Sequence, residues 1–129
     1  MYNFNPASKQ NGASMWGLIG GSALVILFAL ITMKLVPAYL DNNKVANALA
    51  SLAEQPGVGS WSRRQMIEKV SNTLYIDMAH DLLDLNEALI ITKAKDTKVI
   101  SIDYERVIPM AYNISALLDF ENSVEVSLR

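Results

Sequence analysis

The chain of 129 residues contains no cysteine, and this absence excludes several classes of protein. A disulfide scaffold, a zinc site with cysteine ligands and a cysteine nucleophile all need a thiol. An excess of positive charge is also missing, because 11 basic side chains stand against 13 acidic ones. Affinity for nucleic acid comes from lysine and arginine, so the sequence predicts no nucleic-acid partner.

Charge is also missing from one continuous segment near the start of the chain. No charged residue lies between Lys9 and Lys34, and residues 15–33 are almost entirely apolar. As a helix this segment would be roughly 28 Å long, close to the ~30 Å hydrocarbon core of a bilayer. A buried core helix would need more surrounding protein than this chain supplies, and no Ala-x-Ala-like cleavage site follows the segment. We therefore expect a permanent membrane anchor that contacts lipid.

Composition divides the chain into three parts. We expect a flexible tail over residues 1–12, a transmembrane signal-anchor helix over 13–36 and one α+β domain over 37–129. The lysines on the two sides of the anchor nearly balance, so the positive-inside rule does not decide the orientation.

Helical periodicity continues after the anchor. Pro37 predicts a kink or a new first turn, and an apolar face then recurs at helical spacing, formed by Val45, Ala48, Leu49, Leu52 and Ala53. Residues 55–57, Gln-Pro-Gly, end this helix. A second helix begins at Ser62, because Gln65 completes a capping box and Trp61 with Met66 has the spacing of a hydrophobic staple.

The period changes to two from about residue 89. Ile100, Ile102 and Tyr104 alternate with polar residues, and similar runs cover residues 89–94, 114–120 and 124–128. This pattern predicts an antiparallel meander of three or four strands with one apolar face covered by the helices. Residues 75–88 resist assignment to helix, strand or loop.

One cluster carries groups that could do chemistry: Asp77, His80, Asp81 and Asp84, which would share a face if they were helical. The chain has a single histidine and no paired-histidine motif, so a solvated acidic face explains the cluster better than a metal or catalytic site. We expect no catalytic residue, no metal and no cofactor, hence no enzyme.

Two other groups of residues suggest contacts with other molecules. Ala13, Gly17 and Gly21 recur every four residues, a spacing that lets a second helix of the membrane approach closely. Trp61, Arg63 and Arg64 form a candidate partner contact, because two arginines in a first helical turn oppose the helix dipole and suit an acidic partner or lipid headgroups. Tolerated surface charge and the staple role of Trp61 are the alternatives.

Several segments resemble a known family. Residues 9–19 (KQNGASMWGLI), 34–40 (KLVPAYL), 103–105 (DYE) and 119–126 (DFENSVEV) are similar to the proteobacterial domain-of-unknown-function 4845 family. This resemblance implies a single-pass inner-membrane protein with a periplasmic carboxy-terminal domain, usually encoded next to signal peptidase I. It carries over no catalytic residue.

The order of elements is also similar to that of type IV pilins and pseudopilins. Those proteins carry a glutamate at the fifth position after the cleaved glycine, whereas counting from Ala13 places Gly17 there. We therefore expect a membrane-anchored periplasmic interaction or accessory protein, non-catalytic, in secretion or envelope assembly, with a pilin-like assembly subunit as the alternative. Signal peptidase I, suspected by resemblance only, another membrane protein or a second copy is the expected partner, in addition to membrane lipid.

Overall fold

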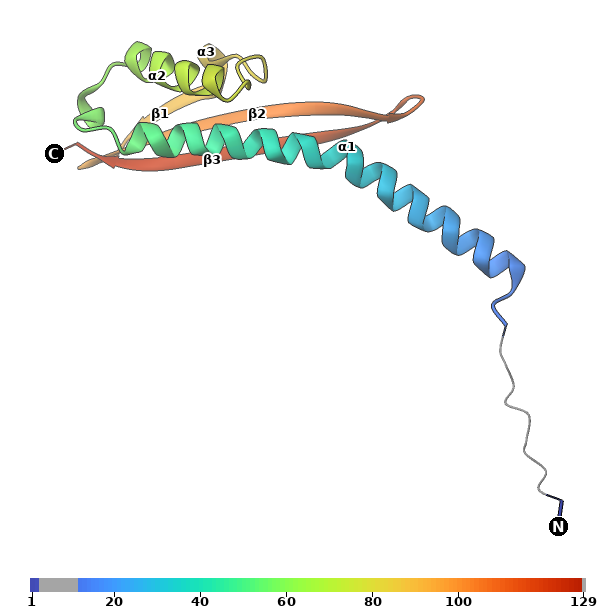
Figure 1. Cartoon of the computed structure of the whole chain (residues 1–129). Coiled ribbons are helices and arrows are strands. Elements are labelled where there is room, and N and C mark those ends of the chain that lie inside the picture. The colour runs from blue at the N-terminus through green and yellow to red at the C-terminus, as the bar shows by residue number, and fades with distance from the viewer. Residues whose placement is uncertain (3–11, 129) are drawn as a thin grey trace. The chain divides into compact units, whose positions relative to one another are not determined.

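The computed structural model describes residues 1–2 and 12–128, so residues 3–11 of the expected tail lie outside the described part (Figure 1). The chain divides into two compact units between Thr32 and Met33. One helix, α1 (Met15–Ala53), belongs to both units and contains Pro37. The expected anchor and the amphipathic segment after it are therefore one continuous helix.

In the first unit, α1 is apolar around its whole circumference. Ser14 precedes the helix, and its hydroxyl accepts a hydrogen bond from the Gly17 N–H at 3.0 Å. None of the side chains in the most apolar window of α1 is buried. This part of α1 is apolar on every side and is not covered by protein. The helix is long and apolar enough to span a membrane.

In the second unit, α1 is amphipathic and forms part of the core. Its buried residues, Ala38, Val45, Ala48, Leu49 and Leu52, recur at helical spacing as the sequence predicted. A turn and the short 3₁₀ helix η1 (Val58–Ser60) follow. Gly57 adopts the left-handed region with φ 73°, which glycine enters without steric cost.

The helix α2 (Arg63–Ile76) begins with the predicted capping box. The Ser62 hydroxyl accepts from the Gln65 N–H, and the Gln65 side chain accepts from the Ser62 N–H. The buried residues of α2 are Met66, Val70 and Leu74. One further turn, α3 (Leu85–Ala88), is capped by Asp84 and leads directly into the sheet.

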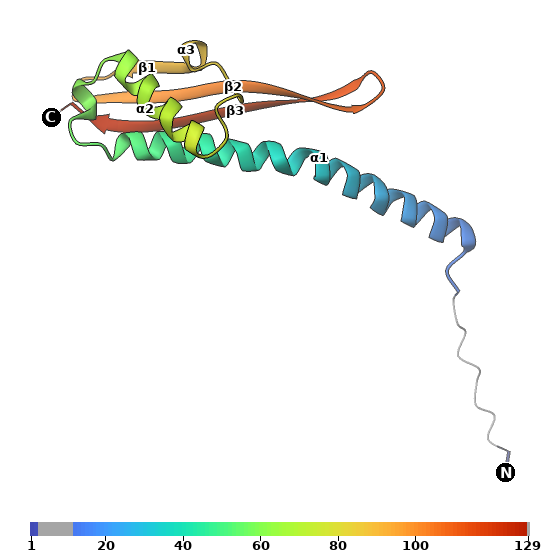
Figure 2. The same cartoon turned by 45° about the horizontal axis from the view of Figure 1, so that its top comes forward.

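Three antiparallel strands form the sheet in the order β1-β2-β3: β1 (Leu89–Lys93), β2 (Thr97–Ala111) and β3 (Ile114–Ser127). Every second residue of β2 from Lys98 to Tyr104 is buried beneath the helices. β1 begins at Leu89 opposite Ile102, so from Ile102 toward its turn the β2–β3 hairpin continues without β1 (Figure 2). The predicted α+β architecture, with helices over one face of a meander, is confirmed.

One proline lies on the unpaired edge of this hairpin. The Ala94 N–H donates to the Thr97 carbonyl at 2.8 Å, which directs the Thr97 backbone toward β1. Alternate residues of an antiparallel strand face the same way, so the backbone of Pro109 faces away from β3. Proline therefore costs no hydrogen bond within the sheet at this position.

The structure decides two points that the sequence left open. The runs at 114–120 and 124–128 form the single strand β3 rather than two strands. Residues 77–84 are not helical, because α2 ends at Ile76 and Met78 takes φ 55° in the left-handed region. The acidic cluster around His80 therefore does not share a helical face.

Candidate functional site

A polar layer joins α1 to the sheet inside the second unit. The Asn42 Oδ1 accepts two hydrogen bonds, from the Tyr104 hydroxyl at 3.1 Å and from the Asn122 Nδ2 at 2.8 Å. The preceding residue of α1, Asp41, pairs with Arg106 at 2.9 Å. These contacts place polar groups in a half-buried layer where each has a partner.

Tyr104 is the titratable group that this layer perturbs. Burial raises the pKa of Tyr104 to about 12, Arg106 opposes the increase and Asp41 adds to it. A raised phenol pKa keeps the hydroxyl protonated, so it remains a donor to Asn42. The arrangement suits a structural hydrogen bond rather than a general base, which would need a pKa close to the working pH.

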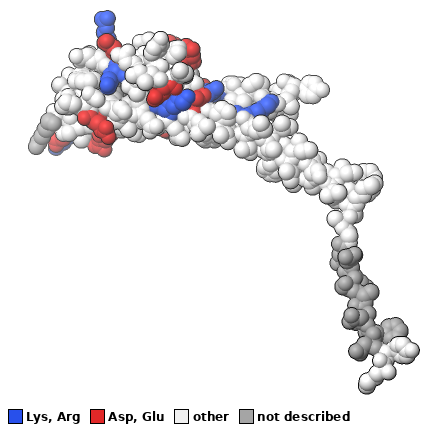
Figure 3. Space-filling view, viewed as in Figure 1, with Lys and Arg blue, Asp and Glu red and all other residues white. Residues whose placement is uncertain are grey.

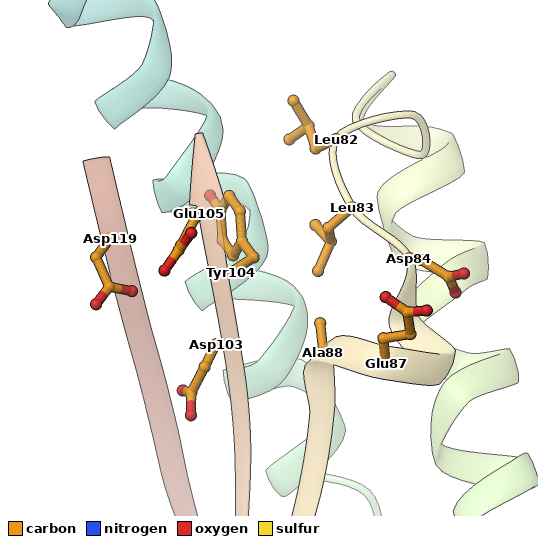
Figure 4. A pocket seen from close by; sticks show the side chains of 9 residues that line it. All are labelled: Leu82, Leu83, Asp84, Glu87, Ala88, Asp103, Tyr104, Glu105 and Asp119. Atoms are coloured by element: carbon orange, nitrogen blue, oxygen red, sulfur yellow. The ribbon is translucent and has the colours of Figure 1, made fainter. Parts of the chain in front are cut away.

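A pocket rich in carboxylates opens at the edge of β2 beside the start of β1 (Figure 4). Its volume is about 430 Å³. Leu82, Leu83 and Ala88 lie across from Tyr104, and carboxylates surround this apolar floor. The carboxylates are those of Asp84, Glu87, Asp103, Glu105 and Asp119. One of their oxygens, Asp103 Oδ1, is buried without a hydrogen-bond partner in the described part of the chain.

The polar side chains that line this pocket are mainly of one kind, carboxylates. Carboxylates, aliphatic side chains and Tyr104 line it, without the lysine, histidine or serine that would make a nucleophile or a proton relay with them. Across residues 1–2 and 12–128, no three acidic, histidine or cysteine side chains converge as a metal site would require. What the pocket offers is a negatively charged rim around a small apolar floor.

The acidic cluster predicted from sequence is spread over a loop. Asp77 caps the carboxyl end of α2 and Asp84 caps the start of α3, so each has a local structural role. His80 lies 3.3 Å from Asp81 and packs against the Tyr75 ring at 5.0 Å between centroids. The loop thus brings together only His80 and Asp81 of the four residues.

The three residues of the candidate partner contact have different surroundings. Trp61 packs against the core from the outside, as its staple role predicts. Arg63 donates to the backbone carbonyls of Leu89 and Asn86, which ties α2 to α3 and β1. Arg64 is exposed, and it is the residue of the three whose charge faces solvent most freely.

The small residues of the first unit lie along one groove. Ala13, Gly17 and Gly21 line it together with Leu18, Ser22, Val25 and Ile26, and its volume is about 530 Å³. A side chain added at Gly21 would meet no atom within 4 Å. The groove is open and lined partly by small residues, and the packing of a second helix against it remains a prediction.

Lys34 is a residue that sequence analysis did not single out. Its ammonium group donates to the carbonyls of Pro109 at 3.1 Å and Met110 at 2.6 Å, near the end of the β2–β3 hairpin. The available signal was the stretch between Arg106 and Asp119, in which no residue is charged. Only the fold reveals that this uncharged stretch contacts Lys34, the residue that follows the apolar segment 15–33.

These features define a small α+β domain that continues from a helix of membrane-spanning length. The model of a family described as a domain of unknown function (DUF4845) matches residues 34–120. The chain belongs to this family, as the resemblance implied. Neither the curated proteins nor the solved structures include a match to it.

Proposed function

We propose that the chain is a single-pass protein of the inner membrane whose carboxy-terminal domain works in the periplasm as a non-catalytic interaction or accessory module. The observation that carries this proposal is the change of character within α1. Its first half is apolar and uncovered, whereas its second half supplies five buried residues to the core of the domain. The domain is thus fixed directly to the anchor.

The open surfaces of the domain support interaction rather than catalysis. The pocket at the β2 edge is an acidic rim on a shallow apolar floor, which fits a basic segment of another protein. The groove at Gly17 and Gly21 fits a helix within the membrane. A partner that reaches both surfaces would itself be a membrane protein, and signal peptidase I is the named candidate.

Site-specific photocrosslinking in native membranes tests the proposal. A photoreactive residue replaces Glu105 at the acidic rim in one variant and Arg64 on the exposed side of α2 in a second, and mass spectrometry identifies the attached protein. We expect one recurrent membrane protein from position 105. Crosslinks only between copies of the chain would favour the pilin-like assembly, and no crosslink above background at either position would contradict an interaction function.

The helix groove has a matched control within the same segment. Gly17→Leu with Gly21→Leu should reduce helix association about tenfold in a membrane two-hybrid assay, whereas Gly20→Leu on another side should leave it unchanged. An equal loss in both variants would show general damage to insertion rather than a packing face.

Topology and catalysis need separate tests. Because the chain has no cysteine, Ser123→Cys provides one thiol in the domain, and an impermeant maleimide should label it from the periplasmic side. Labelling only after the inner membrane is opened would place the domain in the cytoplasm. His80→Ala and Asp81→Ala should leave the cellular phenotype of the protein unchanged, and loss of that phenotype in a folded variant would favour an enzyme.

A further inference from the structure

The far end of the β2–β3 hairpin exposes apolar side chains on its outer face, whereas Ile108 and Leu118 on its inner face are half-buried against the core. Residues 107–118 contain no charged residue. The exposed fractions of the large apolar side chains there are 66% for Val107, 65% for Ile114 and 61% for Leu117. Tyr112 is fully exposed at the turn and takes φ 48°, a conformation that bulky residues rarely adopt. The sequence 107–118 thus forms an uncharged hairpin tip.

The boundary of this tip is sharp. On the outer face of the sheet, the cross-strand pairs change from Glu105 opposite Asp119 to Val107 opposite Leu117 within one step of the alternation. All charged groups of the hairpin lie on the other side of this boundary, and the end of the hairpin carries no charge in Figure 3. An exposed apolar patch bordered by charged residues marks a surface for contact with another protein or a membrane.

The tip is held next to the start of the domain. Lys34 donates to the carbonyls of Pro109 and Met110, and it is the first charged residue after the apolar segment, separated from Thr32 by a single residue. A lysine at the end of a membrane span extends its ammonium group to the headgroup region. The hydrogen bonds of Lys34 therefore place Pro109 and Met110 at that same depth.

We propose that the hairpin tip, residues 107–118, inserts into the headgroup and upper acyl region of the bilayer that holds α1. Tyrosine is enriched at this depth, and an exposed apolar surface gains free energy there without a binding pocket. The domain then has two attachments to one membrane, the span and the tip. This inference rests on the proposed function, because it takes α1 as the span.

The absence of cysteine allows a direct measurement on the full chain. Tyr112→Cys is labelled with nitrobenzoxadiazole, and the protein is reconstituted in nanodiscs of phosphatidylcholine and phosphatidylglycerol with or without nitroxide-labelled lipid. Ser123→Cys, at the other end of the same outer sheet surface, carries the same label as a matched control. We expect lipid nitroxide to quench position 112 at least about threefold more strongly than position 123, and aqueous iodide to show the reverse order.

A third label separates this inference from the proposed function. Phe28→Cys places the same probe in the middle of the apolar segment. Quenching at 28 but not at 112 would overturn the docking of the tip and leave the span intact, whereas no quenching at 28 would overturn the membrane anchor itself. Protection of position 112 from iodide without quenching by lipid would show a protein cover over the tip and would also overturn lipid docking.

A charge variant tests the apolar surface without changing the labelled position. Val107→Asp with Leu117→Asp in the Tyr112→Cys background should lower the lipid quenching at 112 to the level of the 123 control. Ser115→Asp, on the same outer surface beside Pro109, introduces one charge as a milder comparison. Unchanged quenching in the double variant would contradict insertion by these side chains.

Discussion

Near β1, the β2–β3 hairpin carries carboxylates on its outer face and buried apolar residues on its inner face, whereas residues 107–118 carry apolar side chains on both faces. The pairing of the strands is antiparallel throughout, so the backbone does not cause this difference. The inner face is packed against the core in both regions, because Ile108 and Leu118 lie beyond the polar layer of Asn42 and Asp41 and still contact the core. The comparison teaches that the difference lies on the outer face, which changes from carboxylates to exposed apolar side chains at Val107 and Leu117.

The largest expected effect on the free energy of unfolding comes from the difference in burial between the two ends of the β2–β3 hairpin. Ile102 is fully buried beneath the helices, so Ile102→Ala should lower the free energy of unfolding by about 2–4 kcal/mol. Val107→Ala at the tip should change it by less than about 0.5 kcal/mol. Urea denaturation of the full chain in mild-detergent micelles measures both. Equal losses would contradict the division of the hairpin into a packed base and an exposed tip.

The second-largest expected effect on stability comes from the polar layer of Asn42 and Asp41. Asn42→Ala removes the acceptor of both Tyr104 and Asn122, and leaving half-buried donors unpaired should cost about 1–3 kcal/mol. Asn43→Ala changes the neighbouring, exposed asparagine and serves as the control. If the two variants unfolded at the same urea concentration, the layer would have no role in holding the sheet to α1.

Lys34 should affect the tip alone. Lys34→Met removes the donor to Pro109 and Met110, and hydrogen exchange of amides in residues 107–118 should become about tenfold faster, which corresponds to ~1.4 kcal/mol. Amides of β1 should exchange at unchanged rates. Lys44→Met, which removes an ion pair with Asp41, is the control at the base. Faster exchange throughout the sheet would show that Lys34 supports the whole domain.

The stability of the packed end of the hairpin, where Tyr104 lies, should also depend on alkaline pH. The pKa of Tyr104 is raised to about 12 in the folded chain from an ordinary value of 10.0. The unfolded state therefore loses its phenol proton first, so this contribution to stability is complete below pH 10 and declines as the pH rises toward 12. The difference in unfolding free energy between the wild type and Tyr104→Phe should shrink over this range. A constant difference would contradict the raised pKa.

The smallest effect concerns the carboxylates of the outer face. Asp103 lies opposite Glu121 and Glu105 lies opposite Asp119, and like charges in directly opposed positions destabilise a sheet. Glu121→Lys should raise the free energy of unfolding by about 0.2–1 kcal/mol at low salt. Glu125→Lys, opposite Val99, should have less effect. A gain that persisted unchanged at high salt would argue against a charge effect.

Local signals in the sequence predicted the base of the domain well. The capping box of Ser62 and Gln65 depends on residues three apart, and the buried face of α1 depends on helical spacing, so both were visible without the fold. The family assignment, too, followed from segments of the sequence. The helix that was expected to contact lipid is apolar and uncovered, whereas its membrane and its orientation remain predictions.

Predictions failed where polar residues point inward. The predicted alternation begins at Ile100, whereas β2 begins at Thr97, and Lys98 is buried there and donates to the Gly59 carbonyl at 2.9 Å. Asn122 likewise divided β3 into two predicted strands, although it faces inward and donates to Asn42. In each case the compensating acceptor is at least 39 residues away in the chain, beyond the reach of local patterns.

In the proposed membrane-anchored arrangement, Pro109 has a consequence for the behaviour of many copies of the chain. Diffusion in two dimensions brings identical domains into frequent edge-on encounters, and a bare strand invites a neighbour to continue the ladder. Beyond Ile102 the free edge of β2 reaches Pro109, which has no backbone N–H to donate to a neighbouring strand. The carbonyls of Pro109 and Met110 already accept hydrogen bonds from Lys34. Crowded copies are thereby prevented from fusing their sheets along the full length of β2.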